Sequence, residues 1–481
     1  MPYIYNTYEE AIKVDLEELP ENLKNTLNGR QSQPEQEESE QREGEGNEEV
    51  VAWLLNYAKI ETKDYNKLIE LFKKKTTEIR NLLGKYLQSQ NLSFLIGNGC
   101  SLYAGSKSIN TSNTSPETSS INKILDENED MFSKEITNSL KEKKLEELLN
   151  VLSQIENYYK VIDDQSKSKK ISEIISKVKN EFLLEYVCGI NYANNEFHRQ
   201  FLKKIIARDT NKSRVKIFTL NYDLIIEKAA EELGIIVNNG FIGFILRKFD
   251  PSVYEIDYHI KKPEMNRPIP LNKSINLYKL HGSISWFKHS KEADEGNKDR
   301  NIDYEVVENQ PIFYDNGGKV KFSESDYLQN SLIYPTYTKI AQSFDSPYGE
   351  LFRHFTNALN SRNSTLIVIG YSFSDEHVNK IIENALTNPD FNLLIFSFES
   401  SEKSEESAEK SEESAEKSEE SAEKPKKSQK KPETLRKLFE RGKKDSKITI
   451  FYGKLLGDFR IISSYLLPYV DIEEESERQI Q

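Results

Sequence analysis

Hydrophobic residues follow two kinds of pattern along this chain. Short, nearly continuous apolar runs rich in β-branched and aromatic residues occupy residues 93–96, 215–219, 275–280, 365–369, 391–398 and 447–452. Apolar residues at three- and four-residue steps occupy 50–90, 196–208, 224–233, 347–360 and 459–467. The runs predict buried strands, and the steps predict amphipathic helices. Because the strands alternate with helices, the pattern predicts an α/β fold with a parallel sheet covered on both faces.

The remaining segments suggest how the domain is organised. Residues 106–195 have a helical apolar stripe, which predicts a helical insertion. We divide the chain into an N-terminal helical region at 1–92 with a disordered acidic segment at 31–49, an α/β domain at 93–470, and an acidic tail at 471–481. Residues 401–432 contain three KSEESAE repeats, whose only apolar residue is alanine, so they predict a charged low-complexity linker rather than a coiled coil.

Composition narrows the classes of partner and location. The 66 Lys and Arg residues against 79 Asp and Glu give a net charge of −13, which disfavours direct binding of nucleic acid. A basic tract at 424–444 is a nucleic-acid footprint or a solvated linker, and we favour the linker. The N-terminus lacks a signal pattern, and no apolar run is long enough to cross a membrane. Two cysteines, Cys100 and Cys188, form no disulfide framework, so we expect a cytoplasmic protein.

Four unusual turns each follow directly after a predicted strand, at residues 97–101, 219–223, 281–283 and 370–375. Ligands of parallel sheets bind beyond the carboxyl ends of the strands, so we expect these turns to converge on one crevice. The first turn contains Gly97 and Gly99 after an apolar run. Such a turn is expected to leave backbone N–H groups free to bind a diphosphate.

The turns also carry recognisable sequences: GNGCS at 97–101, TLNYD at 219–223, KLHGS at 279–283 and GYSFSDEHV at 370–378. In this order they resemble the four signatures of the sirtuin-like domain. The tyrosine after Asn221, the YPT at Tyr334 and the form GYSFSDEH are similar to the bacterial branch that cleaves NAD in anti-phage defence. The resemblance implies a Rossmann-like parallel sheet, here with a helical insertion and N-terminal helices.

The resemblance also implies a role for individual residues. Asn221 would lie beside the nicotinamide ribose, and His281 would be the catalytic base. The residues that it places around NAD are Gly97, Gly99, Ser101, Thr219, Asp223, Gly370, Ser372 and Asp375. Deacylating sirtuins carry two Cys-x-x-Cys pairs that hold a structural zinc, and this chain lacks them, so we expect no zinc. The other histidines show no ligand spacing with carboxylates or thiols, so we expect no other metal either. Their absence puts peptide deacylation in doubt more than NAD binding.

The residue types suit the implied chemistry. Loss of nicotinamide from NAD generates an oxocarbenium-like ribosyl centre, which needs a polar group near the ribose hydroxyls and a base that exchanges protons near neutral pH. An asparagine supplies the first and a histidine, with an unperturbed pKa of about 6.5, supplies the second. Other interpretations stay open: Asp223 is equally suited to cap the following helix. We interpret Cys100 as a packed residue rather than a nucleophile.

The expected function is therefore an NAD glycohydrolase that releases nicotinamide and ADP-ribose and acts in anti-phage defence by depleting NAD. One alternative is a module that binds NAD or ADP-ribose without turnover, and another is a nucleic-acid-cleaving defence subunit. We expect a homo-oligomer, because the helical parts at 50–90 and 106–195 carry more apolar surface than one sheet needs. The resemblance adds a HerA-like ATPase or another infection-sensing protein as a partner.

Overall fold

The computed structural model describes residues 3–5, 65–106, 119–128, 131–141, 143, 145–186, 189–209, 211–244, 247–261, 268–271, 273–290, 305–309, 313–314, 320–321, 330–332, 346–398, 433–453 and 456–468. The predicted acidic segment at 31–49, the linker at 401–432 and the tail at 471–481 lie outside the described residues. Cys188 and Tyr334 also lie outside them.

A parallel sheet of eight strands forms the centre of the molecule, in the order β1-β17-β16-β15-β2-β3-β9-β4. Each pair of neighbouring strands in it is parallel. The α/β fold class predicted from the apolar runs is therefore confirmed. The strands are β1 (Tyr3–Tyr5), β2 (Asn91–Ile96), β3 (Lys216–Thr219), β4 (Ile236–Asn238), β9 (Ser274–Lys279), β15 (Ser364–Ile369), β16 (Phe391–Ser397) and β17 (Ile448–Tyr452).

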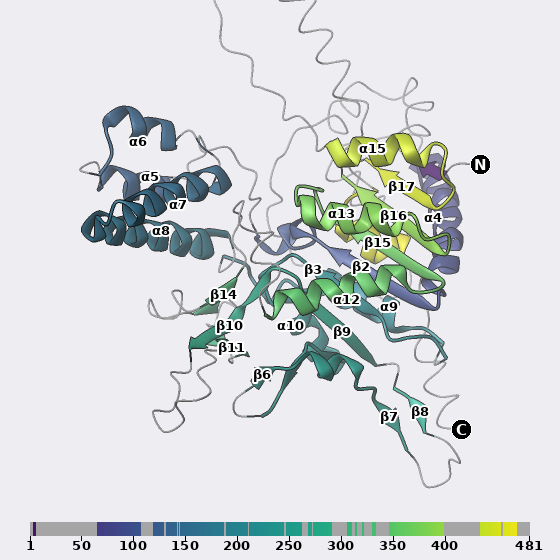
Figure 1. Cartoon of the computed structure of the whole chain (residues 1–481). Coiled ribbons are helices and arrows are strands. Elements are labelled where there is room, and N and C mark those ends of the chain that lie inside the picture. Colours follow the sequence, from purple (N-terminus) through teal and green to yellow (C-terminus); the bar gives the residue numbers. More distant parts are fainter. Residues whose placement is uncertain are drawn as a thin grey trace, which may run out of the picture.

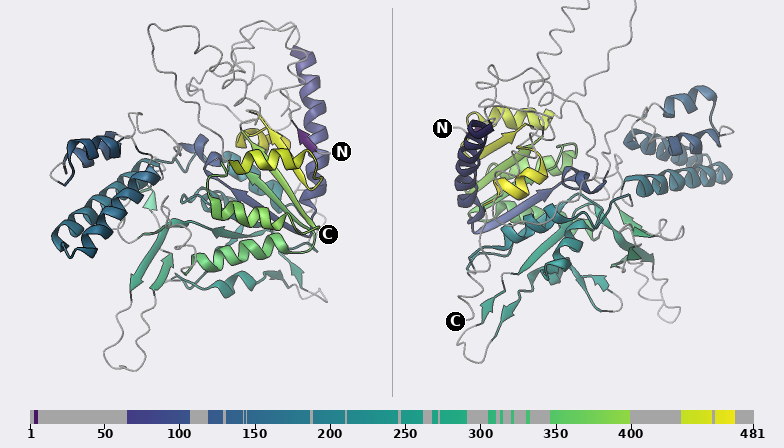
Figure 2. Two further views of the ribbon diagram at one scale, coloured as in Figure 1. Left: turned by 45° about the horizontal axis from the view of Figure 1, so that its top comes forward. Right: turned by 180° about the vertical axis from the view of Figure 1, so that it is seen from behind.

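Helices cover both faces of this sheet (Figures 1 and 2). One face packs against α12 (Tyr348–Asn360), α13 (Glu376–Ala385) and α15 (Glu433–Gly442), and the other packs against α4 (Tyr65–Leu87), α9 (Glu196–Ile206), α10 (Ile225–Glu232) and α16 (Phe459–Ile461). Successive strand residues point to opposite faces. Leu95 and Phe218 thus join the first core, whereas Phe94 and Ile217 join the second. Burial on both faces explains why the strands are continuously apolar.

The predicted helical insertion contains α5 (Ser119–Asp126), α6 (Lys134–Lys141), α7 (Leu145–Val161) and α8 (Gln165–Tyr186). It projects beside the sheet, on the left of Figure 1. Buried residues of the α7 stripe, such as Leu149 and Leu152, pack with buried residues of α8, such as Ile171 and Val178. These residues belong to the same hydrophobic cluster as the sheet face covered by α9 and α10, so the core of the insertion is continuous with that of the sheet.

Several elements differ from what the sequence predicts. A second, antiparallel sheet has the strand order β14-β10-β11-β6-β5, and two short ribbons pair β12 with β13 and β7 with β8. Residues 3–5, inside the region expected to be helical, form the edge strand β1, and α16 continues as a π-helical turn, η7 (Ile462–Leu466). The additional strands are β5 (Phe241–Ile242), β6 (Arg247–Phe249), β7 (His259–Ile260), β8 (Ile269–Pro270), β10 (Gly282–Ser290), β11 (Glu305–Asn309), β12 (Phe313–Tyr314), β13 (Val320–Lys321) and β14 (Asn330–Leu332).

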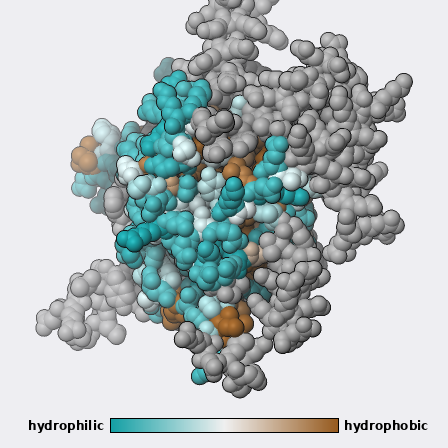
Figure 3. All heavy atoms as spheres, turned by 90° about the vertical axis from the view of Figure 1, so that its right-hand side faces the viewer, coloured by the Kyte–Doolittle hydropathy of each residue, from teal (hydrophilic) through white to brown (hydrophobic). Residues whose placement is uncertain are grey.

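The surface on one side of the molecule is hydrophilic (Figure 3), as expected where amphipathic helices cover a sheet and turn their polar sides to solvent. On the side that lies at the right of Figure 1, the described residues are mostly hydrophilic and the hydrophobic patches are small and separate (Figure 3). Within the described part of the chain, every helix is too short or too polar to span a lipid bilayer.

Candidate active site at the carboxyl edge of the sheet

The strand register brings the starts of the four unusual turns to one level. Ile369 at the end of β15 pairs with Ile96 of β2, Ile96 pairs with Thr219 of β3, and Thr219 pairs with Lys279 of β9. The chain leaves β2 toward β3 and leaves β15 toward β16, on opposite sides of the β2–β15 pair. This is the kind of topological switch point at which α/β sheets bind ligands.

Two of the turns interlock through their backbones at this switch point. The N–H of Gly97 donates to the carbonyl of Ile369, and the N–H of Gly99 donates to the carbonyl of Gly370, both at 2.9 Å. A Cβ atom on Gly97 would lie 2.4 Å from the Gly370 oxygen, and one on Gly99 would lie 2.8 Å from the Gly370 Cα. Glycine is therefore required by the close approach of the two turns.

This contact corrects one expectation from the sequence. The N–H groups of Gly97 and Gly99 are not free for a diphosphate, because they donate to the carbonyls of Ile369, the last residue of β15, and of Gly370, the first residue of the following turn. The assignment of these glycines to NAD binding stays a prediction, but it no longer rests on free N–H groups. Gly370 itself has a φ of +67° and would place a Cβ 2.7 Å from the Cys100 nitrogen, so the interlock constrains it as well.

Cys100 is fully buried beneath this interlock. Its thiol points at the carbonyl of Ile369, with an Sγ to oxygen distance of 3.4 Å. Burial, reinforced by the nearby charge of Asp223, raises the pKa of the thiol well above its usual value. A neutral buried thiol is a poor nucleophile, which agrees with the packing role expected for this residue.

A chain of hydrogen bonds joins three of the predicted site residues. The hydroxyl of Ser101 donates to Oδ2 of Asp223 at 2.9 Å. Nδ2 of Asn221 donates to the Ser101 Oγ at 3.1 Å and to the Gly97 carbonyl at 3.2 Å. Because the single hydroxyl proton of Ser101 is used on Asp223, Ser101 can only accept from Asn221, and this fixes the orientation of the amide.

Asp223 serves both of the roles considered from the sequence. While Oδ2 binds Ser101, Oδ1 accepts from the N–H of Ile225, the first residue of α10, at 3.1 Å. The carboxylate therefore satisfies a free N–H at the start of the helix and also orients the Ser101 hydroxyl. It is buried, with 5% of its surface exposed, so its contribution to a site is through these contacts.

Thr219 positions the turn that carries Asn221. Its hydroxyl donates to the carbonyl of Ile96 at 3.0 Å and accepts from the N–H of Asn221 at 3.1 Å. The carbonyl of Thr219 accepts from the N–H of Leu280, and the carbonyl of Tyr222 accepts from the N–H of Ile284. These bonds attach the Asn221 turn to β2 on one side and to the His281 turn on the other.

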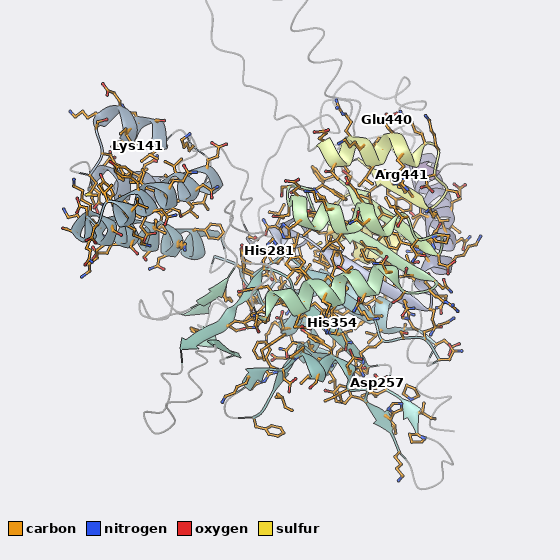
Figure 4. The ribbon with its side chains drawn as sticks, in the orientation of Figure 1. Lys141, Asp257, His281, His354, Glu440 and Arg441 are labelled. Carbon is orange, nitrogen blue, oxygen red and sulfur yellow. The ribbon has the colours of Figure 1, made fainter. Side chains whose placement is uncertain are left out.

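His281 lies in the turn between β9 and β10, at the edge of the sheet domain nearest the helical insertion (Figure 4). Gly282, the next residue, has a φ of +89°, which allows the sharp turn. The His281 ring is 6.4 Å from the ring of Tyr222 and 5.6 Å from that of His377, measured between centroids. Since Asn221 directly precedes Tyr222, the two predicted catalytic residues come from adjoining turns.

The turn after β15 is held by Tyr371. Its hydroxyl lies 3.2 Å from the backbone nitrogen and oxygen of Asp375 and 2.9 Å from Oδ1 of Asn379. Asp375 is buried just before α13, whereas Ser372 is exposed and its hydroxyl bonds to that of Ser374 at 3.1 Å. Of the predicted residues in this turn, Gly370 is at the interlock and Ser372 is on the surface.

Two buried polar clusters next to the turns are not predicted from the sequence. The hydroxyl of Tyr103, at the end of the glycine turn, lies 2.8 Å from Nδ1 of His198 on α9, and burial lowers the pKa of His198 to about 3. Lys279 of β9 forms an ion pair with Glu227 of α10. A charged residue within a buried apolar strand is the only sequence signal for the second cluster, and the first has none.

The topology and the turns together define a Rossmann-like α/β protein with buried polar side chains at its switch point. Residues 215–421 match the protein-family model described as SIR2-like domain. The matched residues include the turns at 219–223, 281–283 and 370–375 but not the glycine turn at 97–101. No curated protein matches the chain.

Solved structures of Sir2 homologues align at low similarity. A Sir2 homologue in complex with NAD aligns with 66% of this chain and 80% of its own, at 11% identity and a TM-score of 0.32. A mutant Sir2 homologue in complex with ADP-ribose aligns with 66% of this chain and 84% of its own, at 11% identity and a TM-score of 0.29. The fold assignment rests on the strand order and register described above.

A metal site in a protein needs several ligating side chains arranged around one point. Within the described ranges, no group of three or more His, Cys, Asp or Glu side chains is arranged to hold a metal ion. The expectation that the protein needs no zinc stays a prediction.

Proposed function

We propose that this protein hydrolyses NAD to nicotinamide and ADP-ribose at the crevice formed by the four turns. The observation that carries the proposal is the hydrogen-bonded chain from Asn221 through Ser101 to Asp223, which adjoins the turn of His281. The SIR2-like domain over residues 215–421 supports an NAD-related activity. The geometry adds an oriented amide and a histidine on adjoining turns.

The reaction breaks the bond between C1′ of the ribose and the nicotinamide nitrogen, which leaves with the bonding electron pair as neutral nicotinamide. Water forms the new bond to C1′ and loses one proton. Both amide hydrogens of Asn221 point at Gly97 and Ser101, so its Oδ1 is the atom that accepts from a ribose hydroxyl. His281 takes the proton from the attacking water.

Burial of the surrounding groups suits this chemistry. Asn221 and His281 are 7% and 4% exposed, so a bound ribosyl centre is screened from bulk water and its developing positive charge meets fixed dipoles. The carboxylate of Asp223 lies one hydroxyl away from Asn221 and adds a negative charge near that centre. These features favour cleavage of the bond between an anomeric carbon and a pyridinium nitrogen.

The biological role that we propose follows from the sequence resemblance. An enzyme that depletes cytoplasmic NAD acts as the effector of an anti-phage defence system, and its activity must depend on assembly or on an infection-sensing partner such as a HerA-like ATPase. NAD is the substrate, and neither nucleic acid nor a membrane is a direct partner.

The test is direct measurement of both products. Purified full-length protein is incubated with NAD over a range of protein concentrations, with and without neighbouring gene products, while mass photometry reports the assembly state. We expect nicotinamide and ADP-ribose in equal amounts. Tight binding of ADP-ribose without nicotinamide under any of these conditions would instead indicate a binding module.

A further inference from the structure

Lys279 is an unusual residue for the end of a buried strand. Its side chain is 3% exposed, and lysine is rarely buried to this extent unless it is paired. It is the last residue of β9 and lies opposite Thr219 of β3 in the sheet register. His281 follows it by two residues.

The ammonium group of Lys279 joins three segments around the proposed site. It lies 3.1 Å from Oε1 of Glu227 on α10, and it donates to the backbone carbonyl of Asp223 in the turn after β3. The strand that leads to His281 is therefore attached to the turn that carries Asn221 and to the helix behind it.

The two contacts of Lys279 have different consequences. A buried ion pair with Glu227 is replaceable by apolar residues of similar size at little cost in stability. The hydrogen bond to the Asp223 carbonyl is not replaceable in this way, because an apolar side chain cannot donate. Asp223 accepts from Ser101, and Ser101 accepts from Asn221. By binding the Asp223 carbonyl, the Lys279 ammonium group therefore fixes the position of the Asn221 amide relative to His281.

The carboxylate of Glu227 offsets the charge of the Lys279 ammonium group. A bare ammonium group beside a ribosyl centre that develops positive charge would oppose the reaction. Burial raises the pKa of Glu227, and the charge of Lys279 opposes that rise and favours the carboxylate. The pair thus supplies a hydrogen-bond donor at the turn with little net charge.

We propose that Lys279 is a positioning residue for NAD cleavage, and that Glu227 neutralises its charge. The inference rests on the proposed function. The inference predicts that turnover falls when the Lys279–Glu227 pair is replaced by apolar side chains, even if the protein remains equally stable.

The decisive variant is the double substitution Lys279→Met with Glu227→Leu, which replaces the ion pair by apolar side chains. We expect an unfolding temperature within a few degrees of the wild type, an ADP-ribose Kd within about threefold, and a kcat at least tenfold lower. Lys228→Met is the matched control, because Lys228 lies next to Glu227 on α10 and forms a partly exposed ion pair with Glu232. This control should retain the wild-type kcat.

A double variant with wild-type kcat would overturn the inference. If the double variant does not fold, Glu227→Gln is the test of the inference. This substitution keeps the shape of the side chain but removes the negative charge that offsets the Lys279 ammonium group. A lowered kcat with unchanged ADP-ribose binding supports the inference, and an unchanged kcat overturns it. A wild-type protein that releases no nicotinamide would instead refute the proposed function, and the inference with it.

Discussion

The carboxyl edge of the sheet and the helical insertion are built in opposite ways. At the sheet edge, two turns contact each other through their backbones. Gly97 and Gly99 donate hydrogen bonds to Ile369 and Gly370, and the contact leaves no room for a Cβ atom. The insertion is held by the apolar side chains of α7 and α8. The sheet edge is therefore fixed by a contact that tolerates no side chain, whereas the insertion is held by apolar side chains that can be exchanged for others of similar size.

The two regions meet near Tyr222. The Phe182 ring of α8 packs edge-on against the Tyr222 ring, with 6.2 Å between centroids. After α8, the hydroxyl of Tyr192 accepts from the N–H of Leu224, and the N–H of Asn191 donates to the carbonyl of Ala104. A helix that belongs to the insertion thus contacts the residue between Asn221 and Asp223, so we expect a change in the insertion to be transmitted to the candidate site.

The largest effect on stability is expected from Gly97→Ala. The added Cβ would lie 2.4 Å from a backbone oxygen that cannot rotate away, so the interlock must separate. We expect a loss of about 3 kcal/mol or more in the free energy of unfolding, which lowers the unfolding temperature by about 6 °C or more.

The matched control for this change is Gly84→Ala on α4, where a Cβ would meet nothing within 4 Å. In a helix interior it should raise stability by about 0.5–1 kcal/mol. Equal unfolding temperatures for the two variants would contradict the interlock as the organising contact of the site.

A smaller effect is expected at the junction between the regions. Phe182→Leu keeps an apolar side chain but removes the ring pair with Tyr222, which is worth about 0.5–1.5 kcal/mol. We expect NAD turnover to fall by as much as about tenfold. The control is Tyr158→Leu, an exposed residue near the far end of α7, which should leave turnover unchanged. If both variants turn over NAD at the wild-type rate, the insertion is not coupled to the site.

The parallel sheet could be predicted because its strands are buried on both faces and therefore read as uninterrupted apolar runs, as in residues 365–369. The antiparallel strands could not, because β6 and β11 carry charged residues such as Arg247 and Glu308 among a few apolar ones. Three-residue β1 is too short to show any period, and its pairing with β17 depends on a strand far along the chain.

The position of the four turns at one edge of the sheet could be predicted, but the contacts between the turns could not. The order of strands and glycine-bearing turns indicates one edge of the sheet. The sequence does not say that Gly97 meets Gly370, because the partner of a turn is set by the strand order and not by the spacing within the turn. The pairing of Lys279 with Glu227 is hidden for the same reason, since 52 positions separate the two residues.

The central claim, that Asn221 and His281 act in one NAD-cleaving site, is tested most directly by the rate of nicotinamide release from three variants side by side. Asn221→Ala and His281→Ala should each lower kcat by about 10²–10⁴, because each removes a group that acts on the reacting ribose or water. His259→Ala, an exposed histidine on β7, should retain the wild-type rate. Rates for Asn221→Ala or His281→Ala within about threefold of the wild type would contradict the claim.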